Sequence, residues 1–489
     1  MELRIRERTA SAFWSLVGRL GLSRERWLGL SVTPKRAVIA AVIGLLTLVI
    51  FLPLYGVDPG ALATYGVFVV LFVPPWERVP YVGRLIIPGA VLAIVVTYPF
   101  YWDGLFTMPI LGPFPDIHTG VVMLIYIMMA VGLNVVVGYA GLLDLGYVAF
   151  YAMGAYTAAW LASVQFAGQD ATGAPLRNIV IGAIDVDPHL GGIHLNPWLL
   201  LLVAGCTTAI IGILIGFPTL RLRGDYLAIV TLGFGEILPQ VFRNGNDLFN
   251  TGFNLTNGPQ GIGPLDGLGF GHTLHRAIGV PANYQLEADF DNLFFWTAIG
   301  LVLLTLFCSL RLRDSRLGRA WIAIREDETA ASAMGVPLMR TKTWSYAIGA
   351  FVGGVAGAFF AFFVSSANPD SFSFNFSVFV LVMVILGGMG NVWGVLFGAA
   401  FLAYLDQAGL ANTGAWLNQH ILPCDQDKAV IGDVFSHGCI DVPQLEFGIY
   451  GLMLLLVMLF RPHGLIPEAR RKLEFEHGVS DEPLVDVQA

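Results

Sequence analysis

The chain has 489 residues, of which 56% are hydrophobic and only 13% are charged, and its mean hydropathy is +0.69. Soluble domains carry about 25% charged residues, so this composition excludes a soluble protein and indicates an integral membrane protein. The formal net charge of −8 says little until the charges are located along the chain. Because helices satisfy every backbone polar group within a single segment, we expect an all-α polytopic membrane protein.

Residues 1–36 form a basic segment. They contain eight Arg and Lys residues, which makes the segment too long and too charged for a cleavable signal peptide. Phe13, Trp14, Val17 and Leu20 are spaced for an amphipathic helix on the cytoplasmic leaflet.

Stretches of about 20 apolar residues are long enough to cross the hydrocarbon core of a bilayer. Several of the candidates here are short, and we therefore expect 10–12 transmembrane helices. The candidate spans are 37–54, 61–74, 85–100, 118–138, 141–162, 197–217, 224–242, 292–310, 343–364, 376–389, 390–408 and 445–460. The fourth and fifth spans, like the tenth and eleventh, are joined by little but glycine-rich turns, so either pair is a candidate for a re-entrant or broken helix.

The basic residues are distributed unevenly between the two sides that alternating spans define. With the N-terminus inside, the cytoplasmic regions receive 23 of the 27 Arg and Lys residues. The other side keeps only Arg177, Arg243, Arg276 and Lys428. Because cytoplasmic loops carry the excess of positive charge, we predict that both termini are cytoplasmic.

This topology predicts how the whole chain is organised. Extra N-terminal transmembrane helices at 37–110 follow the basic segment, then the main transmembrane domain at 111–465 and a cytoplasmic tail at 466–489. The long external loops are 163–196, 243–291 and 409–444, and the segment 311–342, which we call the central loop, is cytoplasmic.

Two of the four cysteines, Cys424 and Cys439, lie in an external loop. An oxidising compartment allows a disulfide between them, which would close a loop of about 15 residues and stabilise it by roughly 3 kcal/mol. The alternative is a pair of free thiols. Cys206 and Cys308 lie within spans and are interpreted as small apolar side chains.

Polar residues interrupt the segment GLNVVVGYAGLLDLGYVAFYAMGAYTAA at 132–159. Gly138 is one of several glycines that thin or break the helix there, and Asn134 and Asp144 lie at membrane depth. An intramembrane carboxylate is costly and by default indicates a functional site. These three residues are therefore candidates for the translocation path or for helix packing, with a hydrated interfacial position as the alternative for Asp144.

The segment RLRGDYLAIVTLGFGEI at 221–237 opens the seventh span. Asp225 and Tyr226 lie in its first turn, where the helix dipole favours a negative charge. Glu236 lies two thirds of the way along, between glycines. This carboxylate either lines the translocation path or bonds the backbone of a neighbouring helix, and we favour the second interpretation.

Two groups of glycines are spaced by four residues. The first is Gly349, Gly353 and Gly357, and the second is Gly390, Gly394 and Gly398. Such spacing allows close approach of helix backbones in lipid, so packing is favoured and a role in the translocation path is secondary for Gly353, Gly390 and Gly394.

The central loop is a charge-dense segment between two apolar stretches. It carries seven basic and four acidic residues, with a short apolar stripe at Leu317, Ala320, Trp321 and Ile324. Acidic residues interrupt the stripe, small residues continue it, and Gly335 ends the helix. The pattern predicts short helices whose exposed surface suits the groove of a partner; a solvated connector is the alternative.

The run LGRAWIAIREDETAASAMGV resembles the coupling ("EAA") loop of ATP-binding-cassette importer permeases, and most closely the M-type permease subunit of branched-chain amino-acid uptake systems. The segments at 132–159 and 221–237, TNGPQGI (256–262) and LGGMGNVWGVLFGA (386–399) also resemble this family, in its order. The resemblance implies a permease bundle with cytoplasmic coupling helices. It also implies a loop that docks into an ATPase through Arg325, Glu326, Asp327, Glu328, Ala330, Ala331 and Gly335.

The same resemblance implies the assembly and the substrate. We expect a second, homologous permease subunit, two cytoplasmic ATPase subunits, a periplasmic or lipid-tethered binding protein, and Leu, Ile or Val as substrate, in the bacterial inner membrane. No GxxxxGK[ST] occurs, so ATP and Mg²⁺ should bind the partner ATPase and this chain should hold no cofactor. We predict no catalytic residues, no metal site and no nucleic-acid partner.

Two other functions remain as alternatives. Related permeases carry urea or short amides, so a permease for those substrates is the nearest. From another class, an ion-coupled secondary transporter would bury a carboxylate with a cation at mid-membrane, but no basic residue accompanies the candidate carboxylates. A membrane enzyme would need a clustered catalytic set, and none is discernible.

Overall fold

The computed structural model of the chain describes residues 92, 95–100, 102, 114–167, 178–182, 191–222, 225–247, 254–268, 290–420, 435–436, 439–440, 442–460 and 464–465. The chain divides into two compact units, Met1–Asp116 and Ile117–Ala489. The first unit is described only around η2 (Tyr98–Phe100), so the predicted basic segment and the first two spans lie outside the described residues.

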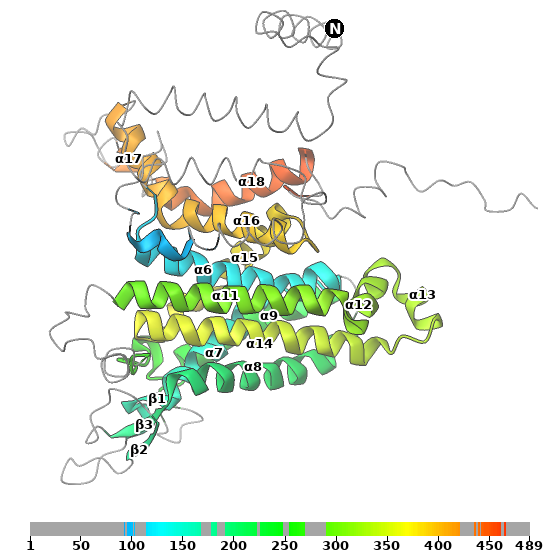
Figure 1. Cartoon of the computed structure of the whole chain (residues 1–489), viewed down its shortest axis with the longest axis horizontal. Coiled ribbons are helices and arrows are strands. Elements are labelled where there is room, and N and C mark those ends of the chain that lie inside the picture. Colours follow the sequence, from blue (N-terminus) through cyan, green and yellow to red (C-terminus); the bar gives the residue numbers. More distant parts are fainter. Residues whose placement is uncertain are drawn as a thin grey trace, which may run out of the picture. The chain divides into compact units, whose positions relative to one another are not determined.

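The second unit is a bundle of helices (Figure 1). Its α-helices are α6 (Ile117–Leu133), α7 (Val148–Leu161), α8 (Pro197–Thr219), α9 (Asp225–Arg243), α11 (Phe290–Asp314), α12 (Arg316–Glu326), α13 (Glu328–Ala333), α14 (Leu338–Val364), α15 (Phe374–Gly387), α16 (Val392–Tyr404), α17 (Leu410–His420) and α18 (Glu446–Phe460). Within the described residues, six helical segments are long and apolar enough to cross a membrane, and α7 and α15 are shorter apolar helices. The predicted helical, polytopic architecture is therefore confirmed.

Helix α6 lies at the centre of the bundle because it is apolar on every side. It contacts α11, α14, α15 and α16, and Val121, Ile125 and Met129 along it are fully buried. A helix that is hydrophobic all round is stable only where every face is covered. Helix α14 packs in turn against α7 and α8, so the layers run side by side as Figure 1 shows.

Both pairs of spans joined by glycine-rich turns are separate helices with non-helical backbone at the joint, and we call these two joints the helix breaks. Helix α6 continues into a π-helical turn, η4 (Asn134–Tyr139), and the chain then runs without helix until α7 begins. Between α15 and α16, Gly388 and Gly390 have positive φ angles of 114° and 88°. Gly390 therefore belongs to the turn and not to a helical row of glycines, which corrects the predicted second ladder.

The ends of several predicted elements differ from the structure. Helix α16 continues through the π-helical turn η9 (Leu405–Gly409) into α17, so the external loop expected from residue 409 begins after His420. Helix α11 extends to Asp314 and α14 begins at Leu338, so the central loop is shorter than predicted and comprises residues 315–337 in the structure. Hydropathy marks the apolar stretch only, whereas the helices extend beyond it.

A small sheet lies at the end of the bundle opposite the central loop (Figure 1). Strand β3 (Gly192–Leu195) pairs antiparallel with β1 (Ala162–Ser163) and parallel with β2 (Asn178–Ile181), and a further hairpin joins β4 (Phe435–Ser436) to β5 (Cys439–Ile440). We did not predict these strands. The all-α expectation holds for the membrane part and not for the loops.

Candidate functional site

The central loop folds as two short helices with well-defined caps. The Ser315 side chain accepts a hydrogen bond from the backbone N–H of Gly318 and caps α12. The Asp327 carboxylate accepts from the N–H groups of Thr329 and Ala330, at 2.7 and 3.0 Å, and caps α13. These caps explain why a polar segment forms helices, because side-chain oxygens replace the missing partners of the first turn.

Three contacts attach the central loop to the bundle. The indole of Trp321, which is fully buried, donates to the Thr341 carbonyl oxygen at 2.8 Å. The Lys342 ammonium, itself buried, donates to the Glu328 carboxylate at 2.6 Å. Arg325 donates to the carbonyl oxygen of Gly138, in the π-helical turn that ends α6. The loop is thus tied both to α14 and to the first helix break.

The structure corrects the predicted orientation of part of this loop. We expected Ala331 to face a partner, but its side chain is buried within the chain. We expected Glu328 to contact the ATPase, but its carboxylate pairs with Lys342 of this chain. Ala330 is exposed as expected, and Met334 is 85% exposed. The exposed ridge of the loop consists of Thr329, Ala330, Ser332, Ala333, Met334 and Gly335.

Gly335 ends α13 as the sequence predicts. Its φ angle is +84°. The N–H of Gly335 donates to the carbonyl oxygen of Ser332, and the N–H of Val336 donates to the carbonyl oxygen of Ala331. This is the Schellman arrangement, which needs a left-handed residue and therefore favours glycine. An added Cβ at Gly335 would meet nothing within 4 Å, so the glycine is required by backbone conformation and not by space.

The first helix break carries Asp144, which is 1% exposed. Its Oδ1 accepts from the N–H of Gly146 at 2.9 Å, whereas Oδ2 is buried without a hydrogen-bond partner. The hydroxyl of Tyr346 on α14 is also buried and interacts electrostatically with this carboxyl. Asp144 is therefore enclosed by protein, which contradicts the hydrated interfacial alternative.

Side chains from two other helices hold the break in place. Thr231 of α9 accepts from the N–H of Leu145 at 3.1 Å, and Ser377 of α15 donates to the Leu145 carbonyl at 2.7 Å. An added Cβ at Gly146 would lie 2.2 Å from the Thr231 carbonyl oxygen, so α9 passes directly against the break. Non-helical backbone at membrane depth is tolerated only where neighbouring protein satisfies it, as here.

The two helix breaks contact each other. The Oδ1 of Asn134, which is fully buried, accepts from the N–H of Gly390 at 2.9 Å, and its Nδ2 has no hydrogen-bond partner. An added Cβ at Gly138 would lie 2.7 Å from the same Gly390 nitrogen. Asn134, Gly138 and Gly390 thus form one junction, in which Asn134 and Gly390 are 256 residues apart in the sequence.

The glycines of α14 face α7 and α8 without spare room. An added Cβ at Gly357 would lie 1.9 Å from the Tyr151 carbonyl oxygen, and one at Gly353 would lie 3.2 Å from the Tyr147 ring. In the other pair of helices, the Gly394 carbonyl oxygen lies 2.4 Å from the Cβ position of Gly387. These distances support packing as the role of Gly353 and Gly394.

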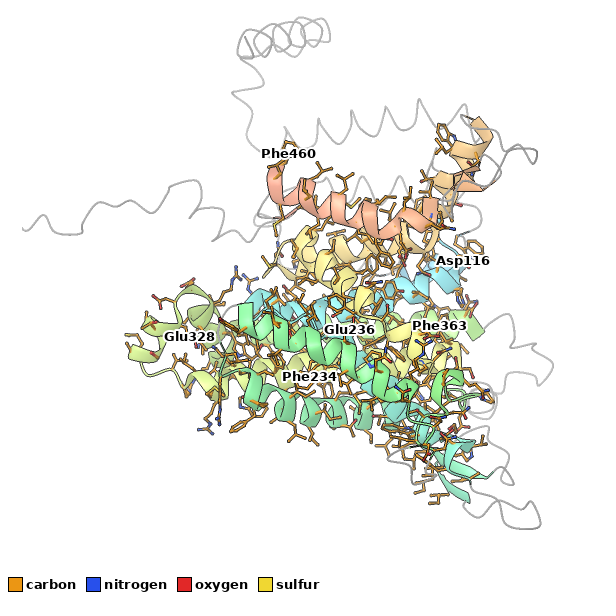
Figure 2. The ribbon with its side chains drawn as sticks, turned by 180° about the vertical axis from the view of Figure 1, so that it is seen from behind. Asp116, Phe234, Glu236, Glu328, Phe363 and Phe460 are labelled. Carbon is orange, nitrogen blue, oxygen red and sulfur yellow. The ribbon has the colours of Figure 1, made fainter. Side chains whose placement is uncertain are left out.

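Helix α9 carries the remaining predicted residues, of which Glu236 is labelled in Figure 2. Tyr226 is 72% exposed, and Asp225 begins the helix, although its side chain is outside the described part of the structure. Glu236 is exposed and makes no hydrogen bond or ion pair with any described residue, so it does not bond a neighbouring backbone as we favoured. It lines a cleft with Arg243 and Asp370, whose charged groups lie 3.5 Å apart.

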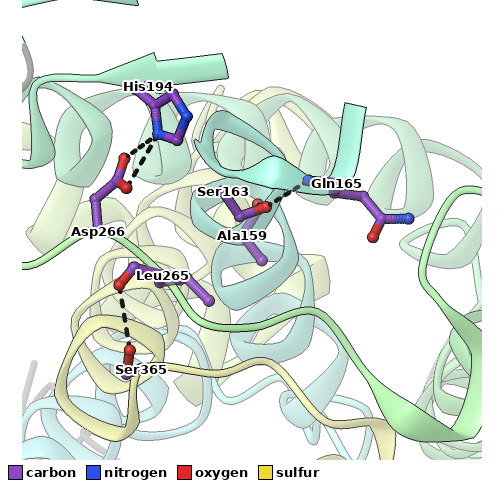
Figure 3. Close-up of polar contacts among 7 residues, drawn as sticks. All are labelled: Ala159, Ser163, Gln165, His194, Leu265, Asp266 and Ser365. Carbon is purple, nitrogen blue, oxygen red and sulfur yellow. Dashed lines mark hydrogen bonds and ion pairs between the residues drawn. The ribbon is translucent and has the colours of Figure 1, made fainter. Parts of the chain in front are cut away.

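The sheet contains a buried pair that we did not predict (Figure 3). The Nδ1 of His194 lies 2.8 Å from the Asp266 carboxylate, while its Nε2 is buried without a partner. Burial raises the pKa of the Asp266 carboxyl, and the hydrogen bond with His194 opposes that shift. These residues are 72 positions apart and carry no local signal, so only the folded loops reveal them.

Other residues that matter here also lacked a sequence signal. Thr231, Ser377 and Tyr346 occur in apolar helices, where Ser and Thr commonly bond their own backbone. Cys424 lies outside the described residues and the side chain of Cys439 is not described, so their pairing stays a prediction. Within the described ranges, no three His, Cys, Asp or Glu side chains gather as a metal site.

Comparison with known proteins agrees with the family expected from the motifs. The sequence model of the branched-chain amino acid transport system permease component matches residues 118–458. The chain is 34% identical to the high-affinity branched-chain amino acid transport system permease protein LivM of Escherichia coli (strain K12), over 73% of this chain and 71% of the relative. No solved structure matches the chain significantly.

Two further relatives extend this likeness. LivM of Salmonella typhimurium is 33% identical over 80% of this chain and 76% of its own length. LivH of the same organism, also a permease of a branched-chain amino acid system, is 28% identical over only 26% of this chain and 41% of its own length. With helices that can cross a membrane and a family match over most of its length, the chain is a membrane permease and belongs to the family of permease components of branched-chain amino acid transport systems.

Proposed function

We propose that the chain is one of two permease subunits of an ATP-driven importer that carries branched-chain amino acids across the bacterial inner membrane. The names of its LivM relatives support the substrate, and the partial likeness to LivH supports a second, related permease subunit. Two ATPase subunits on the cytoplasmic side and an external binding protein complete the assembly, and ATP and Mg²⁺ bind the ATPases.

The observation that carries this proposal is the attachment of the central loop to the helix break. Arg325 donates to the Gly138 carbonyl, and an added Cβ at Gly141 would lie 2.8 Å from the Arg325 side chain. A displacement of the exposed ridge therefore reaches the first break through Arg325. This attachment favours a coupling loop over a connector that is only solvated.

The bundle can change conformation at the helix breaks, because the backbone there lacks the regular hydrogen bonds of a helix. Residues of the first break depend on Thr231 and Ser377 for their polar partners, and the junction of Asn134 with Gly390 joins both breaks. We infer that motion of the central loop shifts α9 and α15 relative to α6 through these contacts. Packed interfaces respond to such small displacements by switching between discrete arrangements.

The described residues favour the ion-coupled alternative less than the ATP-driven importer. An ion-coupled transporter would pair a buried carboxylate with a cation, but no cation lies beside Asp144 in the part of the chain that the structure describes. A permease for urea or short amides shares the fold and differs in substrate only.

Reconstitution of the complete importer tests the proposal. The purified complex in liposomes should accumulate radiolabelled leucine only when ATP is inside and the binding protein outside, and unlabelled isoleucine and valine should compete. Competition by urea or acetamide but not by isoleucine would show that branched-chain amino acids are not the substrate class. Leucine uptake that follows an ion gradient and ignores ATP would reject the mechanism.

A further inference from the structure

The cleft beside α9 adjoins the first helix break, because Gly235, next to Glu236, packs against Gly146 and Phe374. It has a volume of about 200 Å³ and lies between α9, the turn η8 (Pro369–Phe372) and the start of α15. Its lining residues are Glu236, Pro239, Gln240, Arg243, Pro369, Asp370, Ser373, Phe374 and Asn375. A cleft of this volume has room for a small polar metabolite.

The charges in the cleft are separated and incompletely paired. Glu236, labelled in Figure 2, is exposed and has no partner among the described residues. Arg243 and Asp370 lie 3.5 Å apart with half or more of each side chain exposed, so water screens this pair. The cleft therefore offers a free carboxylate for a cation and a guanidinium that is only loosely held.

Glu236 and Arg243 carry the charges opposite to the two charged groups that an α-amino acid bears on one carbon. Glu236 and Arg243 are seven residues apart on one helix, which places their Cα atoms about 10.5 Å apart along the axis. Because both side chains are long, the carboxylate and the guanidinium can lie closer together than the two Cα atoms. Pro239 and Phe374 line the same cleft with apolar surface, and Gln240 and Asn375 add neutral hydrogen-bonding groups.

We propose that this cleft is a binding site for a free, zwitterionic α-amino acid, in which Glu236 binds the α-ammonium group and Arg243 attracts the α-carboxylate. The inference rests on the proposed import of amino acids. It places a binding site for them in the permease itself, in addition to the site on the external binding protein. A bare inorganic cation would not use Arg243, and an anion would be repelled by Glu236 and Asp370. The apolar lining accepts the aliphatic side chain.

Protection of a cysteine in the cleft tests this site without relying on transport. Ser373 is replaced by Cys in a background in which the four native cysteines are Ser, and the complete complex is labelled with a membrane-impermeant maleimide in the absence of binding protein. Leucine should slow labelling in a saturable way. 4-Methylpentanoate, which keeps the carboxylate and the side chain but lacks the ammonium group, should protect poorly.

The variant Glu236→Gln should raise the leucine concentration needed for half protection about tenfold, because a charge-assisted hydrogen bond is replaced by a weaker neutral one. Glu236→Asp should recover part of the loss. The matched control is Asp291→Asn, at the start of α11 and outside the cleft, which removes a similar charge and should leave protection unchanged.

Three results would overturn the proposal. One is leucine protection that is equal in Glu236→Gln and the parent protein, and another is equal protection by 4-methylpentanoate. The third is loss of the assembled complex in Glu236→Gln, which would assign Glu236 to a contact with the partner subunit. Leucine uptake by the parent complex, measured in parallel, reports on the proposed function separately, because uptake can persist when protection fails.

Discussion

The buried pair of Lys342 and Glu328 offers a sharp test of how the central loop is held. The Lys342 side chain is 4% exposed and Glu328 is 26% exposed, with 2.6 Å between their charged atoms. Replacing Glu328 with Ala leaves an ammonium buried without this partner, and breaking such a pair costs about 3–5 kcal/mol. Since Glu328 is partly exposed, we expect the lower end, about 3 kcal/mol.

Hydrogen exchange of the α13 amides measures this effect locally. A loss of about 3 kcal/mol corresponds to exchange that is faster by roughly two orders of magnitude, because each 1.4 kcal/mol is a factor of ten. Amides in the middle of α6 are the internal control and should not change. ATP hydrolysis by the complex should continue while leucine uptake falls, because a loosened loop transmits less motion.

The double variant Glu328→Gln with Lys342→Met distinguishes the pair from the residues themselves. It removes both charges and keeps similar volumes, so protection of α13 should return to near the parent value. The reasoning is refuted if Glu328→Ala exchanges at the parent rate. It is also refuted if the double variant is as unstable as the single one, because the charge would then not be the cause.

Three further predictions concern the loop and the packing of α14. Ala330→Trp, on the exposed ridge, should abolish co-purification of the ATPase subunits without lowering the melting temperature of the permease; retained co-purification would remove the ridge from the interface. Asp327→Ala should cost the loop about 1 kcal/mol through its lost cap, and Asp327→Asn much less, as read from hydrogen exchange of α13. Gly357→Ala should lower the melting temperature in detergent because its Cβ would lie 1.9 Å from a backbone oxygen, with an expected cost of about 1–3 kcal/mol. Gly300→Ala, where a Cβ meets nothing within 4 Å, is the control, and an equal loss in both variants would contradict the packing argument.

Much of the architecture follows from the sequence because hydropathy and glycine spacing are local properties. A run of about 20 apolar residues favours crossing the membrane wherever it packs, so most of the spans predicted from residue 118 onward coincide with described helices to within a few residues. Glycine-rich joints indicated the two helix breaks, and the charges of the central loop and its helix-ending Gly335 distinguished that loop from the apolar spans. The likeness of that loop to a coupling loop is also a local property, and it was enough to indicate the family.

Only the tertiary structure decided which of those residues act together. The orientation of Ala331, the pairing of Glu328 with Lys342 and the open position of Glu236 each depend on neighbours that sequence spacing does not reveal. The junction of Asn134 with Gly390 joins positions 256 residues apart. Hydropathy reports whether a segment prefers lipid to water, but hydrogen bonds between the helix breaks depend on where distant backbone atoms meet, and that is a property of the packed bundle.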